Sequence, residues 1–252
     1  MPPESVKELL AESGLAFTGT VEAADATTVP GLPVDDRTVV VRVSEVLHAP
    51  QAVDLHGGST VTVQLADHLP PLAPGDEATF FANGVAYGDE LAVAEVGRSS
   101  TQDAAPSARL AGLDHDVTPV RAAAAELAMD RIVEHARAVD AIVRAQVVAL
   151  AMVPRTGPPQ EHDPQWWVAT LRTDLVAKGD IEAGADVAVL YANSLDVRVR
   201  TRPKPKAGQG GLWLLHRTAD PALAAQAAYE LLDPLDLQDS IVLDVLREHG
   251  IA

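Results

Sequence analysis

Histidine and carboxylate side chains are the groups in this sequence that could bind a metal ion or move a proton. The chain has 252 residues, with eight histidines and 36 acidic residues but no cysteine. Thiolate metal sites are therefore excluded, and any metal would need imidazole and carboxylate ligands. No two histidines stand at the spacing with which one helix holds zinc. The histidines are His48, His56, His68, His115, His135, His162, His216 and His249.

Two of these histidines have acidic neighbours along the chain. Residues 161–163 read Glu-His-Asp, and His115 lies between two aspartates. Adjacent residues rarely converge on one ion unless ligands from elsewhere in the chain join them. We interpret both clusters as solvated loop, and we expect neither a metal nor another cofactor.

The common catalytic motifs are absent from the sequence. It contains no nucleophile elbow, phosphate-binding loop or dinucleotide fingerprint, and the glycine cluster GQGG at 208–211 is interpreted as a turn. We therefore expect a non-enzymatic protein without catalytic residues. A hydrolase with a site assembled from distant residues stays an alternative.

A basic segment, residues 198–206, concentrates positive charge in an acidic chain. Its five cations are Arg198, Arg200, Arg202, Lys204 and Lys206. If the segment is an extended hairpin, alternation points all five the same way. We favour an exposed hairpin that neutralises acidic surface; the alternative is a site for single-stranded nucleic acid or another anionic ligand.

Two adjacent tryptophans, Trp166 and Trp167, stand at the start of a predicted strand. In a strand one ring faces inward and the other outward, so one of them is a candidate anchor for a partner. Packing within the protein explains the pair equally well. Together with the basic segment, the two tryptophans form our predicted partner-binding set.

The net charge is −17, from 19 basic and 36 acidic residues. Up to Ala125 there are 6 basic and 18 acidic residues, and after it 13 and 18, so the first half is the more acidic. Such a charge repels nucleic acid and anionic membranes. We therefore expect another protein as the partner, and neither nucleic acid nor a membrane.

The apolar pattern predicts a mainly β chain with a few helices. Helices are expected at residues 4–13 and 119–138, and an amphipathic helix from Leu237 to His249. Strands are expected at 15–21, 39–47, 60–65, 78–82 and 91–96, and again at 141–148, 166–176, 186–191 and 212–216.

The same order of elements in both halves predicts an internal duplication. The segments that align are Gly19–Val21 with Ala145–Val147, Arg42–Leu47 with Leu171–Val176, Thr60–Leu65 with Asp186–Tyr191, Pro74–Gly75 with Ala207–Gly208, and Phe80–Phe81 with Trp213–Leu214. The alternative is that any two β-rich halves align this loosely. We predict one domain at 1–104, a linker at 105–118 and a second domain at 119–252.

Each half resembles the netrin-like, or tissue-inhibitor-of-metalloprotease-like, branch of OB-fold modules, in its bacterial form. The likeness is carried by FTGTV at 17–21, VSEVL at 43–47 and LAPGDEATFF at 72–81, and in the second half by Lys178–Gly179 and the Gly208 turn. It implies two OB-like five-stranded β-barrels in tandem, each preceded by a helix, with a helix at the carboxyl end. The zinc chelation by which known members inhibit metalloproteases does not carry over, because it needs an amino-terminal cysteine.

These observations give our leading hypothesis of a non-enzymatic protein-binding or assembly module. Its contacts are expected from the loops at 27–36 and 154–164 and from the basic segment. The first residues lack the basic and apolar regions of a secretory signal, and no apolar run reaches the length of a membrane span. We expect a cytoplasmic protein, and its excess of arginine over lysine is typical of bacteria with GC-rich genomes.

Overall fold

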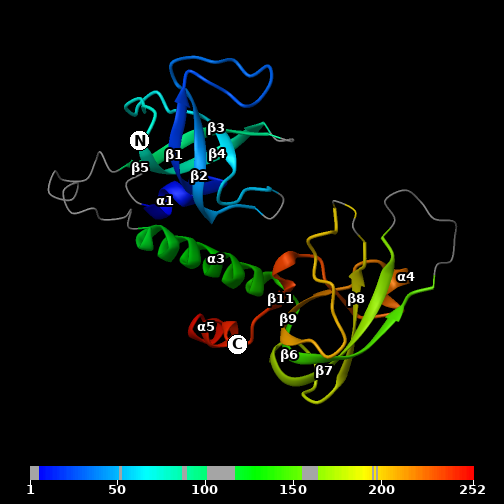
Figure 1. The fold of residues 1–252 in the computed structure, drawn as a ribbon. Helices are drawn as coiled ribbons and strands as arrows, with labels where there is room; N and C mark the ends of the chain where they lie inside the picture. The colour runs from blue at the N-terminus through cyan, green and yellow to red at the C-terminus, as the bar shows by residue number, and fades with distance from the viewer. Residues whose placement is uncertain are drawn as a thin grey trace. The chain divides into compact units, whose positions relative to one another are not determined.

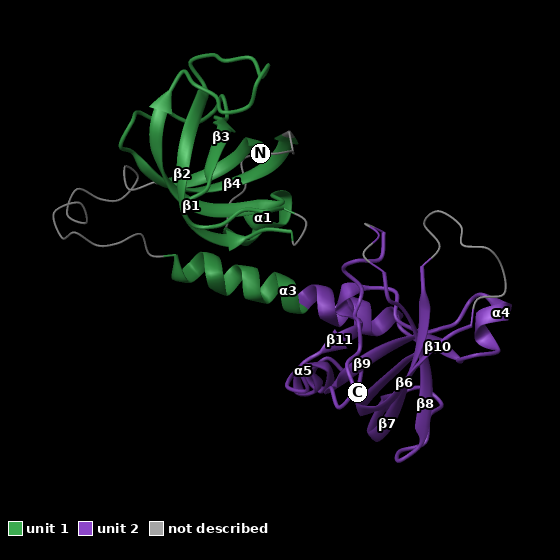
Figure 2. Cartoon of the chain, turned by 45° about the vertical axis from the view of Figure 1, so that its right-hand side comes forward, with its two compact units in different colours: residues 1–129 green, residues 130–252 purple. Residues whose placement is uncertain are grey.

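A computed structural model describes residues 6–50, 53–86, 90–100, 117–154, 164–194, 196 and 198–252. The chain divides into two compact units, Met1–Met129 and Asp130–Ala252, which Figure 2 shows in different colours. Each unit is built around a strongly curved sheet (Figure 1). In the described part of the chain, no helix is long and apolar enough to cross a membrane.

The first unit contains a closed five-stranded barrel. Its strands are β1 (Leu15–Ala24), β2 (Thr38–His48), β3 (Thr60–Gln64), β4 (Glu77–Ala86) and β5 (Leu91–Ser100). They follow the order β1-β2-β3-β5-β4, with β3 and β5 parallel and the other neighbours antiparallel. Inward side chains, half of them valines, fill the barrel, and Phe17 stacks on Phe80 with ring centroids 5.4 Å apart. Each such buried side chain contributes roughly 1.5–3 kcal/mol.

The second unit repeats this barrel. Its strands are β6 (Ala141–Met152), β7 (Trp166–Lys178), β8 (Asp186–Ala192), β9 (Gly210–Arg217), β10 (Tyr229–Glu230) and β11 (Leu237–Gln238). The short β10 pairs parallel with β8 and antiparallel with β9, which closes the ring β6-β7-β8-β10-β9, and β11 adds to β9. The fold is therefore two OB-like barrels in tandem, as the sequence predicts.

Helices accompany both barrels. They are α1 (Val6–Glu12), α3 (Thr118–Ala138), α4 (Pro221–Ala224) and α5 (Val242–Glu248), with a 3-10 turn η1 (Pro234–Asp236). Within the first unit, Leu10 of α1 and Val120 of α3 pack against Phe81 on the outer side of the barrel. The boundary between the units thus falls inside α3, after Met129. The predicted linker at 105–118 lies outside the described residues except for its last two.

The bulges of the first strands show the duplication directly. In β1 the pairing with β2 shifts between Ala16 and Phe17, between Thr18 and Gly19, and between Val21 and Ala23. In β6 the pairing with β7 shifts at the three positions that lie 126 residues later. Bulges bend a strand and increase its twist, so both barrels are closed by the same irregularities.

The turn before the fourth strand is also repeated. Gly75 donates its N–H to the carbonyl of Val21, and Gly208 donates to the carbonyl of Val147 in the same way. Both glycines have positive φ angles, 93° and 76°, which glycine adopts without strain. The predicted alignments of these turns, of β3 with β8 and of β4 with β9 are confirmed.

The predicted alignment of the second strands is wrong by one residue. Thr20 of β1 and Gln146 of β6 are equivalent positions. Arg42 pairs with Thr20 and Arg172 pairs with Gln146, so Arg42 corresponds to Arg172 and not to Leu171. Because side chains alternate along a strand, a shift of one residue exchanges inward and outward positions. The predicted helix at 237–249 is also too long, because its first residues form β11 and Ile241 precedes the helix with 73% of its surface exposed.

Candidate functional site

The two predicted tryptophans lie at one end of the second barrel. Trp167 is on the inward side of β7, packs against the core and lies beside Tyr191, with ring centroids 6.4 Å apart. Its indole nitrogen is buried and has no hydrogen-bond partner among the described residues. Trp166 alternates to the outer side and is half-buried. Both tryptophans are half-buried, and Trp167 is the one that packs against the core.

The basic segment is a turn followed by an irregular stretch, not the extended hairpin that we expected. The N–H groups of Val199 and Arg200 both donate to the carbonyl of Asp196, and Val199 is buried, which turns the backbone back on itself. Lys204 donates to the carbonyl of Arg200. Strand alternation therefore does not hold in this segment, and Arg198, Arg200 and Lys206 are its exposed cations.

Backbone hydrogen bonds attach both ends of this loop to the β6–β7 hairpin. Asn193 donates to the carbonyl of Gln165, next to Trp166, and Gly208 donates to the carbonyl of Val147. The structure therefore brings the tryptophan pair and the basic segment to the same end of the second barrel.

The same end carries exposed apolar side chains. The turn glycines Gly75 and Gly208 bond to Val21 of β1 and Val147 of β6. Beyond these two residues, β1 continues for three residues to Ala24, whereas β6 continues for five to Met152. Val148 is 43% exposed and Met152 is 54% exposed. Met152 pairs with Trp167 across the hairpin, whereas Trp166 faces the other side of β7. We call Val148, Met152 and Trp166, at the exposed end of this hairpin, the hairpin surface.

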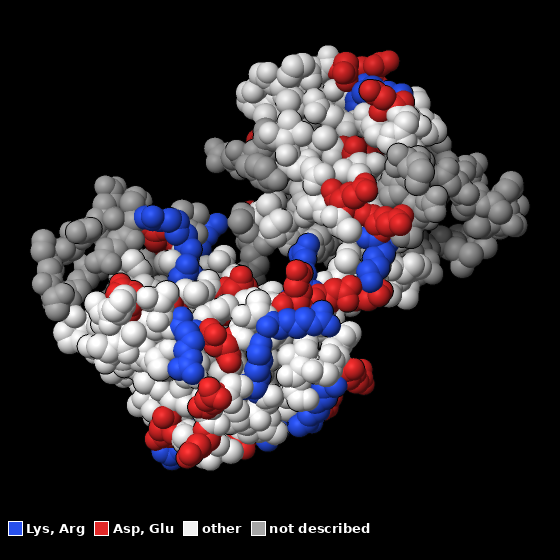
Figure 3. All heavy atoms as spheres, turned by 180° about the vertical axis from the view of Figure 1, so that it is seen from behind, with Lys and Arg blue, Asp and Glu red and all other residues white. Residues whose placement is uncertain are grey.

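The outer sides of β6, β7 and β8 carry opposite charges in pairs. Arg144 contacts Asp174 at 2.8 Å, and Arg172 forms two hydrogen bonds with Asp186 at 2.9 Å each. The Arg172 guanidinium lowers the pKa of Asp186. Figure 3 shows basic and acidic side chains intermingled on one side of the second unit. These arginines are thus neutralised within the unit.

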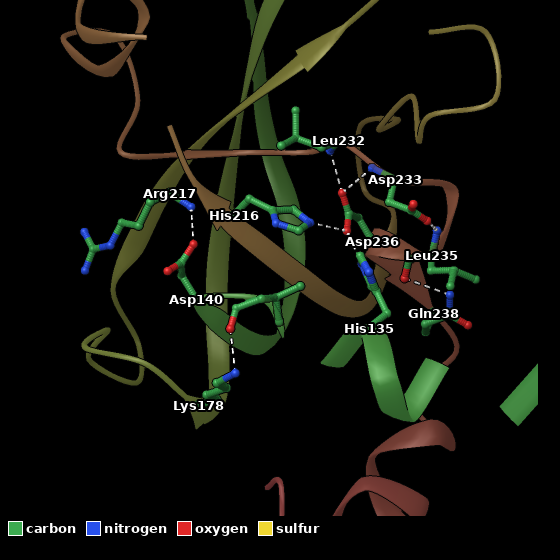
Figure 4. Close-up of polar contacts among 11 residues, drawn as sticks. His135, Asp140, Lys178, His216, Arg217, Leu232, Asp233, Leu235, Asp236 and Gln238 are labelled. Atoms are coloured by element: carbon green, nitrogen blue, oxygen red, sulfur yellow. Dashed lines mark hydrogen bonds and ion pairs between the residues drawn. The ribbon is translucent and has the colours of Figure 1, made fainter. Parts of the chain in front are cut away.

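A second cluster, which the sequence analysis missed, joins His135, His216 and Asp236 (Figure 4). His135 Nε2 lies 2.7 Å from Asp236 Oδ1, and His216 Nε2 lies 3.1 Å from the same oxygen. The three ligand atoms all lie within 4.8 Å of one another. The Asp236 side chain is fully buried, and the imidazoles are 14% and 21% exposed.

Three separate elements position this cluster. His135 comes from the last turn of α3, His216 from β9 and Asp236 from η1. The second carboxylate oxygen of Asp236 accepts hydrogen bonds from the N–H groups of Leu232 and Asp233 at 2.6 and 2.8 Å. These backbone donors hold the carboxylate in place independently of the two histidines.

Lys178 holds the end of α3 that carries His135. Its ammonium group donates to the carbonyls of Ala136, Arg137 and Val139, which have no partner within the helix. Gly179 follows with φ +98°, and a Cβ there would meet Asp140 and Ala141. The Lys-Gly motif of the predicted family resemblance therefore has a clear physical role in the second unit, where it caps the helix.

The charges of the cluster support one another. Burial raises the pKa of Asp236, but the hydrogen bonds from His135 and His216 outweigh it and leave that pKa below its ordinary value. The hydrogen bond to Asp236 raises the pKa of His216. The carboxylate is therefore ionised at neutral pH, and its Oδ1 faces two imidazoles.

The first unit shows what stands at these positions without the cluster. By strand pairing and helix ends, His135 corresponds to Leu9, His216 to Asn83 and Asp236 to Gly97. Three residues separate Ala94 from Arg98, but six separate their counterparts Glu230 and Leu237. The longer connection forms η1 and delivers Asp236.

The two histidine clusters considered from the sequence, Glu161–Asp163 and the residues around His115, lie outside the described residues.

Comparison with known proteins adds little. No protein-family model matches the chain, and no curated protein matches it. Three solved chains do match. One of them, described as "Structural mimicry for functional antagonism", is 11% identical, and the match covers 86% of this chain and 89% of that chain. Its TM-score of 0.21 is too low to show a shared fold.

Proposed function

We propose that this chain is a non-enzymatic protein-binding module whose second barrel contacts the partner through the hairpin surface. The observation that carries the proposal is the exposure of Val148 and Met152 at the end of β6, where Met152 pairs with Trp167. Exposed apolar side chains next to an aromatic ring and flexible cations are typical of the centre and rim of a protein interface. The netrin-like resemblance also favours binding over catalysis.

The surrounding charge indicates the chemistry of the partner. Arg198, Arg200 and Lys206 are exposed in the loop whose two ends bond to the β6–β7 hairpin. Arg198 lies 3.4 Å from Asp196, and the acidic groups on the outer face of β7 and β8 are already paired. The partner surface should therefore combine an apolar side chain with acidic residues. The net charge of −17 and the inward position of Trp167 disfavour nucleic acid, which needs exposed stacking rings.

The test is a quantitative capture experiment with the full chain and cell extract of its source. Met152→Asp is expected to lose a protein that the wild type retains at a fixed stoichiometry, and cross-links to that protein should map to residues 148–152. Ile241→Asp, which changes a still more exposed apolar side chain elsewhere in the second unit, should retain it.

Two outcomes would overturn the proposal. One is capture that Met152→Asp leaves unchanged. The other is tight, salt-dependent binding of a single-stranded oligonucleotide that neutralising Arg198 and Arg200 abolishes, because it would assign the basic segment to nucleic acid.

A further inference from the structure

Beyond a partner surface, the geometry points to a divalent metal site of the zinc type formed by His135, His216 and Asp236. Two imidazole nitrogens and one carboxylate oxygen are a common donor set for zinc, with a fourth position left for water. The cluster lies where α3, β9 and η1 meet. A bound ion would tie α3 to the second barrel.

The distances suit an ion after a small adjustment. Tetrahedral zinc with bonds of about 2.1 Å places its ligand atoms roughly 3.4 Å apart. The two nitrogen-to-oxygen distances, 2.7 and 3.1 Å, need to widen by less than an ångström. Rotation of the two partly exposed rings supplies that movement while Asp236 stays fixed by its backbone donors. These donors are the outer contacts that orient a metal-binding carboxylate.

Attachment of the helix does not by itself explain the cluster. The first unit attaches its equivalent helix with Leu9, whose side chain lies against Gly97, and with Asn83, which contacts the carbonyl of Glu12 and the N–H of Gly14. Burying an ionised carboxylate costs more free energy of folding than burying a leucine or an asparagine side chain. The second unit nevertheless replaces all three positions and lengthens one connection to bring the carboxylate in.

The experiment is a zinc titration of the full chain after treatment with a chelator, followed by calorimetry and by a competing chromophoric chelator. One zinc per chain is expected, and cobalt should give the absorption bands of a four- or five-coordinate site. His135→Gln and His216→Gln should each weaken zinc binding at least about 100-fold, the upper end of what losing an outer contact costs.

The glutamine variants separate a metal site from a hydrogen-bonded clamp. Glutamine keeps an N–H donor for Asp236 Oδ1 but is a poor zinc ligand, so a clamp would survive the change and a metal site would not. His249→Gln, on the exposed end of α5, and His162→Gln, in the Glu-His-Asp motif, are the matched controls and should bind zinc as the wild type does.

The proposal is overturned if the wild-type chain binds no zinc at micromolar concentrations. It is also overturned if binding persists in both cluster variants or is lost in His162→Gln. Tryptophan fluorescence of each variant shows whether the second unit is folded, and Asp236→Asn provides a further loss of ligand should either histidine variant unfold.

Discussion

His135 occupies in the second barrel the position that Leu9 occupies in the first, three residues before the end of the helix. Leu9 lies against the backbone of Gly97, while His135 contacts the carboxylate of Asp236 at the equivalent position. One copy of the module thus closes this joint with an apolar contact and the other with charged and polar groups. Because the two units attach their helices with different side chains, changes to one joint are expected to affect the stability of its own unit and can be measured for each unit separately.

Zinc is expected to stabilise the second unit alone. Binding to the folded state should raise its free energy of unfolding by about 2.7 kcal/mol when free zinc is 100 times the dissociation constant. All three tryptophans, Trp166, Trp167 and Trp213, belong to this unit, so their fluorescence follows its unfolding selectively. A chelator should reverse the shift. An equal shift in His216→Gln would contradict the assignment.

Glu95 predicts a pH dependence in the first unit. It is buried beside Arg98, and burial raises its pKa although the Ala66 N–H and Arg98 oppose the shift. A raised pKa means that the stability from Glu95 is complete below about pH 4.3 and is lost as the pH rises through the folded pKa. Glu95→Gln has no such loss. Its free energy of unfolding, relative to that of the wild type, should therefore rise between about pH 4.3 and the folded pKa of Glu95, by about 1.4 kcal/mol for each unit by which that pKa is raised.

Amide hydrogen exchange of peptides from β4 and β5 measures this difference, since the first unit has no tryptophan. Because protonated Glu95 and glutamine are alike, variant and wild type should converge near pH 4. A difference that grows as the pH falls would show that Arg98 dominates the environment of Glu95 instead.

Gly179 should tolerate alanine less well than Gly184 does. At Gly179 a Cβ would lie 2.7 Å from the Cβ of Ala141 and 2.9 Å from the carbonyl oxygen of Asp140. At Gly184, whose φ is also positive, a Cβ would meet nothing within 4 Å. We expect Gly184→Ala to cost about 1 kcal/mol and Gly179→Ala more than about 2 kcal/mol, measured by denaturant unfolding. Equal losses would mean that the backbone angle alone matters.

Trp213 should be less replaceable than Trp167. Trp213 is fully buried and donates its indole N–H to the carbonyl of Ala145 at 3.0 Å, whereas the indole N–H of Trp167 has no partner among the described residues. Trp213→Phe is expected to destabilise the second unit by about 2–3 kcal/mol through a lost hydrogen bond and a cavity. Trp167→Phe should cost less than about 1 kcal/mol. Fluorescence-detected unfolding of both variants decides the order.

Much of the fold is readable from the sequence because the strands carry strong apolar alternation and the turns carry glycine. Gly75 and Gly208 mark the same turn in both halves, and Phe80 aligns with Trp213 as predicted. The fifth strand of the second barrel escaped prediction because Tyr229–Glu230 and Leu237–Gln238 are too short to show a period. Two residues cannot reveal alternation.

The histidine cluster was hidden for a related reason. His135 and His216 stand far apart in the sequence, and the signal that joins them is their alignment with Leu9 and Asn83 in the other half. Asp236 has no such signal, because the longer connection breaks the alignment just before it. The alternating arginines of the basic segment predict a strand, whereas in the structure Asp196 turns the backbone through local hydrogen bonds.

The sharing of α3 between the units has a consequence for truncated forms of this protein. A fragment ending at residue 104, the boundary suggested by the sequence, would remove Val120 and leave Leu10 and Phe81 uncovered on the first barrel. A fragment ending at Met129 would keep Val120 but would leave the second barrel to begin midway through its own helix, one turn and a half before His135. Overlapping fragments that both contain residues 118–138 are therefore the appropriate way to express either barrel alone.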